Sequence, residues 1–280
     1  MGASMALNLQ AGEHEVAVND LRRDAAAPHL KAGATWADGP REIAAHSEVI
    51  FTSLPGPREV EAVADILIEH MKPGTAWFDL STNSPTVIRK LHARFAAKNI
   101  ALLDAPVSGG PSGAKTRKLA LLVGGDKAVF DKFKPALDAI GDQVIYIGPI
   151  GAGSVAKLVH NMAGYSIQTA LAEVFSMGVK AGVEPLALWA AVRQCSLGRQ
   201  RSFDRLGKQF LRGEFDPPDF ALGRVVVKRR LDEVLIDQHF LQQLADFLAA
   251  GRAGLRLQGG AEFICELGNG MGHGVPPTMI

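Results

Sequence analysis

Lys157 and Asn161 are the pair of residues in this chain whose types and spacing best suit catalysis. They lie four residues apart in a long helical pattern that begins in the glycine-rich turn of residues 148–153. Residues at this spacing share one face of a helix. A lysine in a cleft has a lowered pKa and can exchange a proton with a substrate hydroxyl at neutral pH. Taken alone, the pair is a weak signal, and a solvated helix face is the favoured interpretation.

A second candidate is the turn at residues 104–110, which follows a predicted strand. Successive backbone N–H groups around Ser108, Gly109 and Gly110 can form an anion-binding nest, and the Ser108 hydroxyl adds a donor. Such a nest suits a substrate carboxylate. A plain strand-to-helix turn is the alternative interpretation of the same residues.

Two further positions suit a dinucleotide. Asp20 ends a predicted strand at the point where an acid binds the ribose hydroxyls of NAD and repels a 2′-phosphate. Arg22 and Arg23 leave NADP open, and an exposed loop acid is the alternative for Asp20. Gly2 stands directly before the first helix, where the last glycine of a cofactor-binding turn belongs. The sequence therefore predicts a dinucleotide fold whose first strand and first glycines are missing, unless Gly2 is only a start-site residue.

The elements that must position these residues alternate in the first half of the chain. Strands are predicted at residues 15–20, 48–54, 76–80, 100–104, 119–123 and 144–147, separated by helices. This alternation indicates parallel βαβ units in a doubly wound sheet. Ligands of such sheets bind beyond the carboxyl ends of the strands, where Leu54, Pro55 and Thr82 stand.

The second half is predicted to be helical. A helix of some 30 residues runs from Gly151 toward Gly182, and amphipathic patterns continue beyond Pro185. The sequence thus predicts an α/β domain at residues 1–149 and an all-helical substrate and dimerisation domain at 150–280. The part after about residue 222 lacks a regular pattern.

Composition excludes several classes of function. The 280 residues carry a net charge of +1, so neither nucleic acid nor a membrane surface is predicted as a partner. The two cysteines, Cys195 and Cys265, lie far apart without metal or redox spacing, and a reducing, cytoplasmic location is expected. No apolar run reaches membrane-spanning length, and no His, Cys, Asp or Glu cluster has the spacing of a metal site.

Taken in order, the motifs resemble the β-hydroxyacid dehydrogenase family, which includes 3-hydroxyisobutyrate dehydrogenase. The motifs are Met1-Gly2 and residues 51–55 (FTSLP), 79–85 (DLSTNSP), 104–110 (DAPVSGG), 123–125 (VGG) and 148–161 (GPIGAGSVAKLVHN). The resemblance implies a Rossmann-like first domain, an all-α second domain and a homodimer or homotetramer. It also implies hydride transfer between NAD(P) and a small β-hydroxyacid, a carboxylate substrate, or its semialdehyde.

The resemblance also implies roles for single residues. Lys157 is the implied catalytic lysine, and Asn161 the implied substrate-holding residue beside it. The other implied site residues are Ser108, Gly109, Gly110 and Lys228 for the substrate, and Gly2, Asp20, Leu54, Pro55 and Thr82 for the cofactor.

The sequence departs from the family at three places. The first strand is missing, Arg117 and Lys118 replace a glycine and a small polar residue, and the family pattern ends after Leu222. Lys228 is a weak candidate for a second family lysine, and a shifted reading frame near codon 223 explains the loss of pattern. Two alternatives therefore remain: an inactive oligomeric remnant, and a related imine or 6-phosphogluconate-type reductase.

Overall fold

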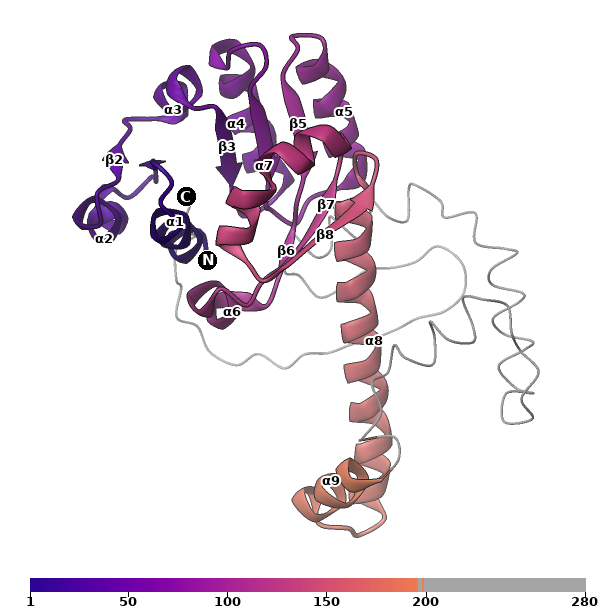
Figure 1. Cartoon of the computed structure of the whole chain (residues 1–280). Coiled ribbons are helices and arrows are strands. Elements are labelled where there is room, and N and C mark those ends of the chain that lie inside the picture. Colours follow the sequence, from indigo (N-terminus) through magenta and orange to yellow (C-terminus); the bar gives the residue numbers. More distant parts are fainter. Residues whose placement is uncertain (196–197, 199–280) are drawn as a thin grey trace. The chain divides into compact units, whose positions relative to one another are not determined.

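The computed structural model describes residues 1–195 and residue 198. Eight strands alternate with helices over this part of the chain (Figure 1). The strands are β1 (Ala17–Val18), β2 (Thr35–Trp36), β3 (Val49–Thr52), β4 (Ala76–Asp79), β5 (Ala101–Asp104), β6 (Val107–Ser108), β7 (Ala120–Gly124) and β8 (Gln143–Gly148). The helices are α1 (Gly2–Ala11), the 3₁₀ helix η1 (Arg23–Ala26), α2 (Ala27–Lys31), α3 (Pro40–His46), α4 (Pro57–His70), α5 (Pro85–Ala96), α6 (Gly110–Thr116), α7 (Lys127–Ile140), α8 (Ala152–Lys180) and α9 (Pro185–Gln194).

A six-stranded sheet forms the framework of the first half. Five of its strands lie in the order β3-β4-β5-β7-β6, and the sixth strand, β8, also pairs with β7. Strands β3, β4 and β5 are parallel, with Thr52 opposite Asp79 and Asp79 opposite Asp104. The carboxyl ends of these three strands therefore lie side by side.

The sheet is mixed, and the predicted parallel arrangement is wrong for its second half. β5 and β6 each pair antiparallel with β7, and only β7 and β8 are again parallel. The chain after β5 first forms β6, which like β5 pairs antiparallel with β7, and the short helix α6 then returns the chain into β7. The α/β alternation is nevertheless as predicted.

The first two strands form a sheet of their own. β1 pairs in parallel with β2, through Ala17 opposite Thr35 and Val18 opposite Trp36, and neither joins the six-stranded sheet. In the described residues α1 is the first element of the chain. The described strands are thus divided between two sheets, with β1 and β2 in the smaller one.

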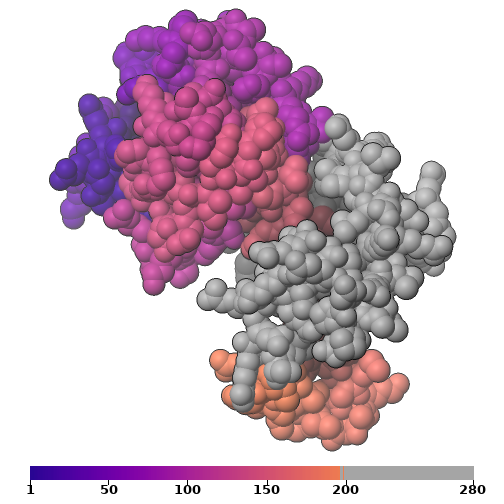
Figure 2. All heavy atoms as spheres, turned by 45° about the vertical axis from the view of Figure 1, so that its right-hand side comes forward, coloured from indigo at the N-terminus to yellow at the C-terminus, as the bar shows by residue number. Residues whose placement is uncertain are grey.

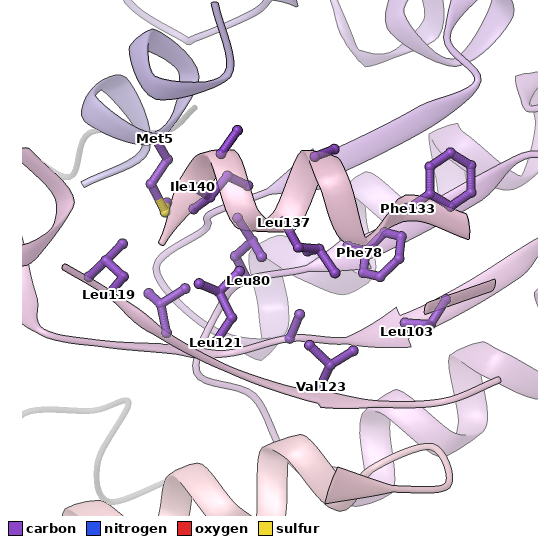
Figure 3. Packing of buried hydrophobic residues seen from close by; sticks show 14 of the residues in the cluster. Met5, Phe78, Leu80, Leu103, Leu119, Leu121, Val123, Phe133, Leu137 and Ile140 are labelled. Carbon is purple, nitrogen blue, oxygen red and sulfur yellow. The ribbon is translucent and has the colours of Figure 1, made fainter. Parts of the chain in front are cut away.

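The hydrophobic core lies on both faces of the six-stranded sheet. On one face, Met5 of α1 and Leu137 and Ile140 of α7 pack on Phe78 and Leu121 of the strands (Figure 3). On the other face, α4 and α5 cover Trp77 and Leu102. Burying side chains of this size stabilises the fold by about 1.5–3 kcal/mol each.

The described residues fall into two compact units, divided within α8 between His160 and Asn161. The atoms of residues 1–150 form a continuous surface in Figure 2, as expected for a closely packed α/β unit. The predicted boundary near residue 150 stays a prediction, because most of the predicted helical domain lies outside the described residues. Across the described part of the chain, no helix combines the length and apolar character needed to cross a membrane.

Candidate active site

A buried carboxylate joins the ends of β3 and β4. Asp79 is fully buried and accepts hydrogen bonds from the Thr52 hydroxyl (3.1 Å), the Ser81 N–H (3.1 Å) and the Asn83 side-chain amide (3.0 Å). The indole of Trp77 donates in turn to the Thr52 hydroxyl at 2.9 Å. Burial raises the pKa of Asp79 above its ordinary value, and these hydrogen bonds oppose that rise.

This network positions the two loops that the sequence assigns to the cofactor. The Ser81 hydroxyl accepts a hydrogen bond from the Leu54 N–H at 2.9 Å, so the loop after β3 is tied to the loop after β4. Leu54 is partly buried, while Pro55 and Thr82 are exposed. The three predicted cofactor residues therefore follow neighbouring strand ends and remain accessible to a ligand.

Asp20 follows β1, as predicted, but its side chain is not an exposed loop acid. It is 7% exposed, and its Oδ1 accepts a hydrogen bond from the Arg22 N–H at 2.8 Å. Oδ2 is buried without a hydrogen-bond partner among the described residues. The sequence located this residue correctly, but its inward orientation depends on packing.

Gly2 begins α1 and is buried. No side chain caps the first turn of α1, and this turn contains no acidic residue. A helix N-terminus of this kind favours an anion, because its first N–H groups lack helical acceptors. The geometry at Gly2 therefore fits the pyrophosphate of a dinucleotide.

The predicted carboxylate-binding residues form a tight turn from β6 into α6. Ser108 ends β6, and the backbone φ angles of Gly109 and Gly110 are +132° and +64°. A Cβ at Gly109 would also stand 2.8 Å from the Lys118 carbonyl oxygen, so a side chain is excluded there on two grounds. No side chain caps α6 within the described residues. Pro111, the second residue of α6, has no N–H, which leaves the Gly110 and Ser112 N–H groups of the first turn as donors for an anion.

The glycine-rich turn before α8 fixes the start of this helix to the sheet. Asp104, at the end of β5, accepts hydrogen bonds from the Gly151 N–H (2.8 Å) and the Ser154 N–H (2.5 Å). A Cβ at Gly153 would overlap the Leu122 carbonyl oxygen and stand 2.9 Å from that of Asp104. Gly153 thus lets α8 contact the sheet directly. Burial raises the pKa of Asp104, although the two N–H donors oppose the shift.

Lys157 lies about one turn beyond this locked end of α8. It is half-buried, and desolvation lowers the pKa of its ammonium group. The described residues provide no ion-pair partner for it. Asn161 follows one turn later in α8 and belongs to the second unit.

His160 of α8 was not singled out from the sequence. Its Nε2 lies 3.4 Å from the Ser108 hydroxyl oxygen, so the helix that carries Lys157 reaches the turn at Ser108. The helical spacing of Lys157 and His160, three residues apart, was the signal that could have identified it. Asp79 and Asp104 were likewise not assigned a role, although Asp104 ends a predicted strand and Asp79 stands one residue before the end of another.

Other predicted residues lie outside this arrangement. Arg117 donates from Nη2 to the Asp138 carbonyl oxygen of α7 at 3.4 Å. Lys228 and the atypical part after residue 222 lie outside the described residues. The described residues contain no group of three or more His, Cys, Asp or Glu side chains that could hold a metal ion.

Known proteins share this architecture. Residues 1–148 match a family described as the NAD binding domain of 6-phosphogluconate dehydrogenase. The chain is 37% identical to an NAD-dependent L-serine dehydrogenase of Pseudomonas aeruginosa over 201 residues, which cover 71% of this chain and 67% of the relative. The chain belongs to the β-hydroxyacid dehydrogenase family.

Two further proteins support the membership. A 3-hydroxyisobutyrate dehydrogenase of Pseudomonas aeruginosa is 36% identical over 201 residues, which cover 71% of this chain and 67% of the relative. The solved structure of Mycobacterium tuberculosis 3-hydroxyisobutyrate dehydrogenase with L-serine has a TM-score of 0.68 and 27% identity, and covers 90% of each chain. This β-hydroxyacid dehydrogenase is therefore an NAD(P)-dependent oxidoreductase with a Rossmann-like domain.

Proposed function

We propose that this dehydrogenase interconverts a small β-hydroxyacid and its semialdehyde, with NAD preferred over NADP. The observation that carries the proposal is the position of Lys157. It is half-buried, its pKa is lowered, and it lies on a helix end that Asp104 fixes to the strand ends. This combination favours an amine that exchanges a proton with a hydroxyl.

In the oxidation direction, the neutral amine of Lys157 accepts the proton of the substrate hydroxyl. A bound NAD(P) would supply the hydride acceptor for the carbon that carries this hydroxyl. The C–H and O–H bonds break, a C=O bond forms, and the proton stays on Lys157 until it passes to solvent. Asn161, one turn further along α8, orients the hydroxyl by hydrogen bonding.

The turn at Ser108, Gly109 and Gly110 binds the substrate carboxylate in this proposal. The uncapped N-terminus of α6 and the two positive φ angles support that role. The Ser108 hydroxyl adds a donor, and its 3.4 Å distance from His160 places the turn beside α8. Lys228 is retained as a further candidate for substrate binding.

The cofactor lies along the strand ends in this proposal. Gly2 faces the pyrophosphate, Asp20 the adenosine ribose, and Leu54, Pro55 and Thr82 the nicotinamide side. The Asp79 network supports this placement, because it fixes the loops after β3 and β4. The carboxylate of Asp20 supports a preference for NAD, since a 2′-phosphate would meet a negative charge.

Binding and turnover measured on the purified chain test the proposal. NADH and NADPH are titrated by fluorescence quenching and thermal shift, and turnover is then followed with 3-hydroxyisobutyrate and L-serine. We expect NADH binding, turnover with at least one acid, and loss of turnover in Lys157→Ala with cofactor affinity retained. A response to neither dinucleotide at millimolar concentration would refute the proposed activity, and undiminished turnover by Lys157→Ala would remove Lys157 from it.

A second candidate is a catalytically impaired family member that acts as an oligomer. The separation of β1 and β2 from the six-stranded sheet favours it, because Asp20 follows β1. Dinucleotide binding without turnover would support this candidate over the first. For either candidate we propose a cytoplasmic homodimer or homotetramer, which sedimentation of the purified chain tests.

A further inference from the structure

His29 is a buried histidine without a hydrogen-bond partner for its ring. It lies in α2 and is 2% exposed, and neither Nδ1 nor Nε2 has a partner among the described residues. Burial lowers the pKa of this imidazole, which favours the neutral ring with one N–H donor and one acceptor nitrogen. The backbone carbonyl of His29 accepts a hydrogen bond from Gln10 of α1 at 3.1 Å, so α2 is tied to α1.

A small cavity connects His29 with the predicted ribose-binding residue. Its water-accessible volume is about 10 Å³, and it is lined by Val18, Asn19, Asp20, Ala25, Ala26 and His29. Oδ2 of Asp20 is the other buried polar group at this cavity without a partner in the described residues. An imidazole and a carboxylate oxygen thus line one cavity, and both lack a hydrogen bond.

Such groups destabilise a fold unless they are satisfied, because each loses its bonds to solvent. A cavity needs roughly 10–15 Å³ of water-accessible volume to hold one water molecule, so this cavity is just large enough for one, and a buried water needs at least two polar partners. A water here would accept from or donate to the His29 ring and donate to Oδ2 of Asp20. Both groups would then be satisfied.

We propose that His29 is a positioning residue for Asp20 and acts through one buried water. The Arg22 N–H holds Oδ1 at 2.8 Å, and the water bound to His29 would hold Oδ2. The carboxylate is then fixed at both oxygens, and the second lone pair of Oδ1 is left for a ribose hydroxyl. This inference rests on the proposed function, since it gives the reason for the preference for NAD.

Cofactor binding by His29→Leu and His29→Gln tests the positioning role. Leucine cannot bind the water, so Asp20 gains freedom, and we expect the Kd for NAD to rise roughly three- to tenfold. The Kd for NADP should change less, and KM for NAD should rise while kcat stays close to that of the unmodified protein. His29→Gln keeps a donor and an acceptor and should restore most of the preference.

His92→Leu is the matched control. His92 is a partly buried histidine on α5 whose Nδ1 lies 3.2 Å from the Leu102 carbonyl oxygen, and it does not line the cavity. Its replacement removes a histidine hydrogen bond elsewhere in the same unit. The ratio of the NAD and NADP dissociation constants should therefore stay unchanged in this variant.

A double-mutant cycle without cofactor separates this inference from the proposed function. Urea unfolding of His29→Leu, Asp20→Ala and the double variant should show a coupling between the two positions. Zero coupling overturns the water link, and coupling with an unchanged ratio of dissociation constants overturns the positioning role. If the unmodified chain binds neither dinucleotide, the proposed function fails and the positioning role fails with it. The double-mutant cycle would still measure whether His29 and Asp20 are coupled through the water.

Discussion

Two glycine-rich turns of this protein begin helices in different ways. The turn before α8 is closed by the protein itself, because the Asp104 carboxylate accepts the Gly151 and Ser154 N–H groups. The turn before α6 has no such internal acceptor among the described side chains, and Gly109 and Gly110 hold positive φ angles there. One helix N-terminus is therefore used to build the fold, and the other has no side-chain cap among the described residues.

The difference shows that a glycine pattern does not by itself indicate a ligand site. What separates the two turns is a carboxylate 47 residues earlier in the chain, at the end of β5. The closed turn keeps Lys157 at a constant position relative to the strand ends. The open turn provides the anion-binding N–H groups that the proposed reaction needs.

Gly153→Ala should break the closed turn and give the largest effect. Its Cβ would overlap the Leu122 carbonyl oxygen, which belongs to a strand and cannot move aside. We expect a loss of about 4 kcal/mol or more in the free energy of unfolding, measured in urea. Gly164→Ala in the same helix is the control. The described residues place nothing within 4 Å of its Cβ, and it should stabilise α8 by roughly 0.8–1 kcal/mol.

Lys157→Met removes the amine that the closed turn positions. Turnover should fall roughly 10²–10⁴-fold, the usual contribution of a general acid–base group. Because burial lowers the pKa of Lys157 in the folded state, the unfolded state binds more protons between the two pKa values. The free energy of unfolding of the unmodified chain should therefore rise as the pH increases between these two pKa values. The Lys157→Met variant should lack this rise. Urea unfolding at several pH values measures it.

The proton transfer from the substrate hydroxyl to Lys157 should also depend on pH. In the oxidation direction, kcat/KM should rise as pH increases through the lowered pKa of Lys157, because only the neutral amine accepts the proton. The measurement is a pH profile with saturating NAD. A flat profile across the titration of this group would contradict a role as general base.

Asp104→Asn weakens the closed turn without changing its shape. One of the two N–H donors would then face an amide N–H₂ group, and we expect a loss of about 1–3 kcal/mol in unfolding free energy. Asp126→Ala, which removes the exposed cap of α7, should cost about 1 kcal/mol and serves as the comparison. Equal losses of unfolding free energy in the two variants would show that burial does not increase the stabilisation by the Asp104 cap.

Two variants, Gly110→Ala and Gly109→Ala, test whether the open turn before α6 binds the substrate carboxylate. A Cβ at Gly110 meets nothing within 4 Å in the described residues, so only the φ of +64° opposes it, at about 1–2 kcal/mol. At Gly109 the Lys118 carbonyl adds a clash, and KM for the hydroxyacid should rise more than in Gly110→Ala. If neither variant changes KM, the turn does not bind the carboxylate.

The sequence by itself determined the alternation of strands and helices, because period and turn residues are local signals. It also assigned site roles that stay predictions, to Lys157, Asn161 and Ser108 and to Gly2, Asp20, Leu54, Pro55 and Thr82. It did not determine that β7 runs antiparallel to β5, since that depends on where the short α6 returns the chain.

Only the tertiary structure decided how the local signals combine. In the sequence, Asp79 and Asp104 were only acids at or near the ends of two predicted strands. Packing made one a link between two loops and the other a helix cap. The inward orientation of Asp20 toward His29 and the contact of His160 with Ser108 were decided in the same way. These are contacts between residues distant in the chain. Their geometry follows from burial and register, which local sequence does not specify.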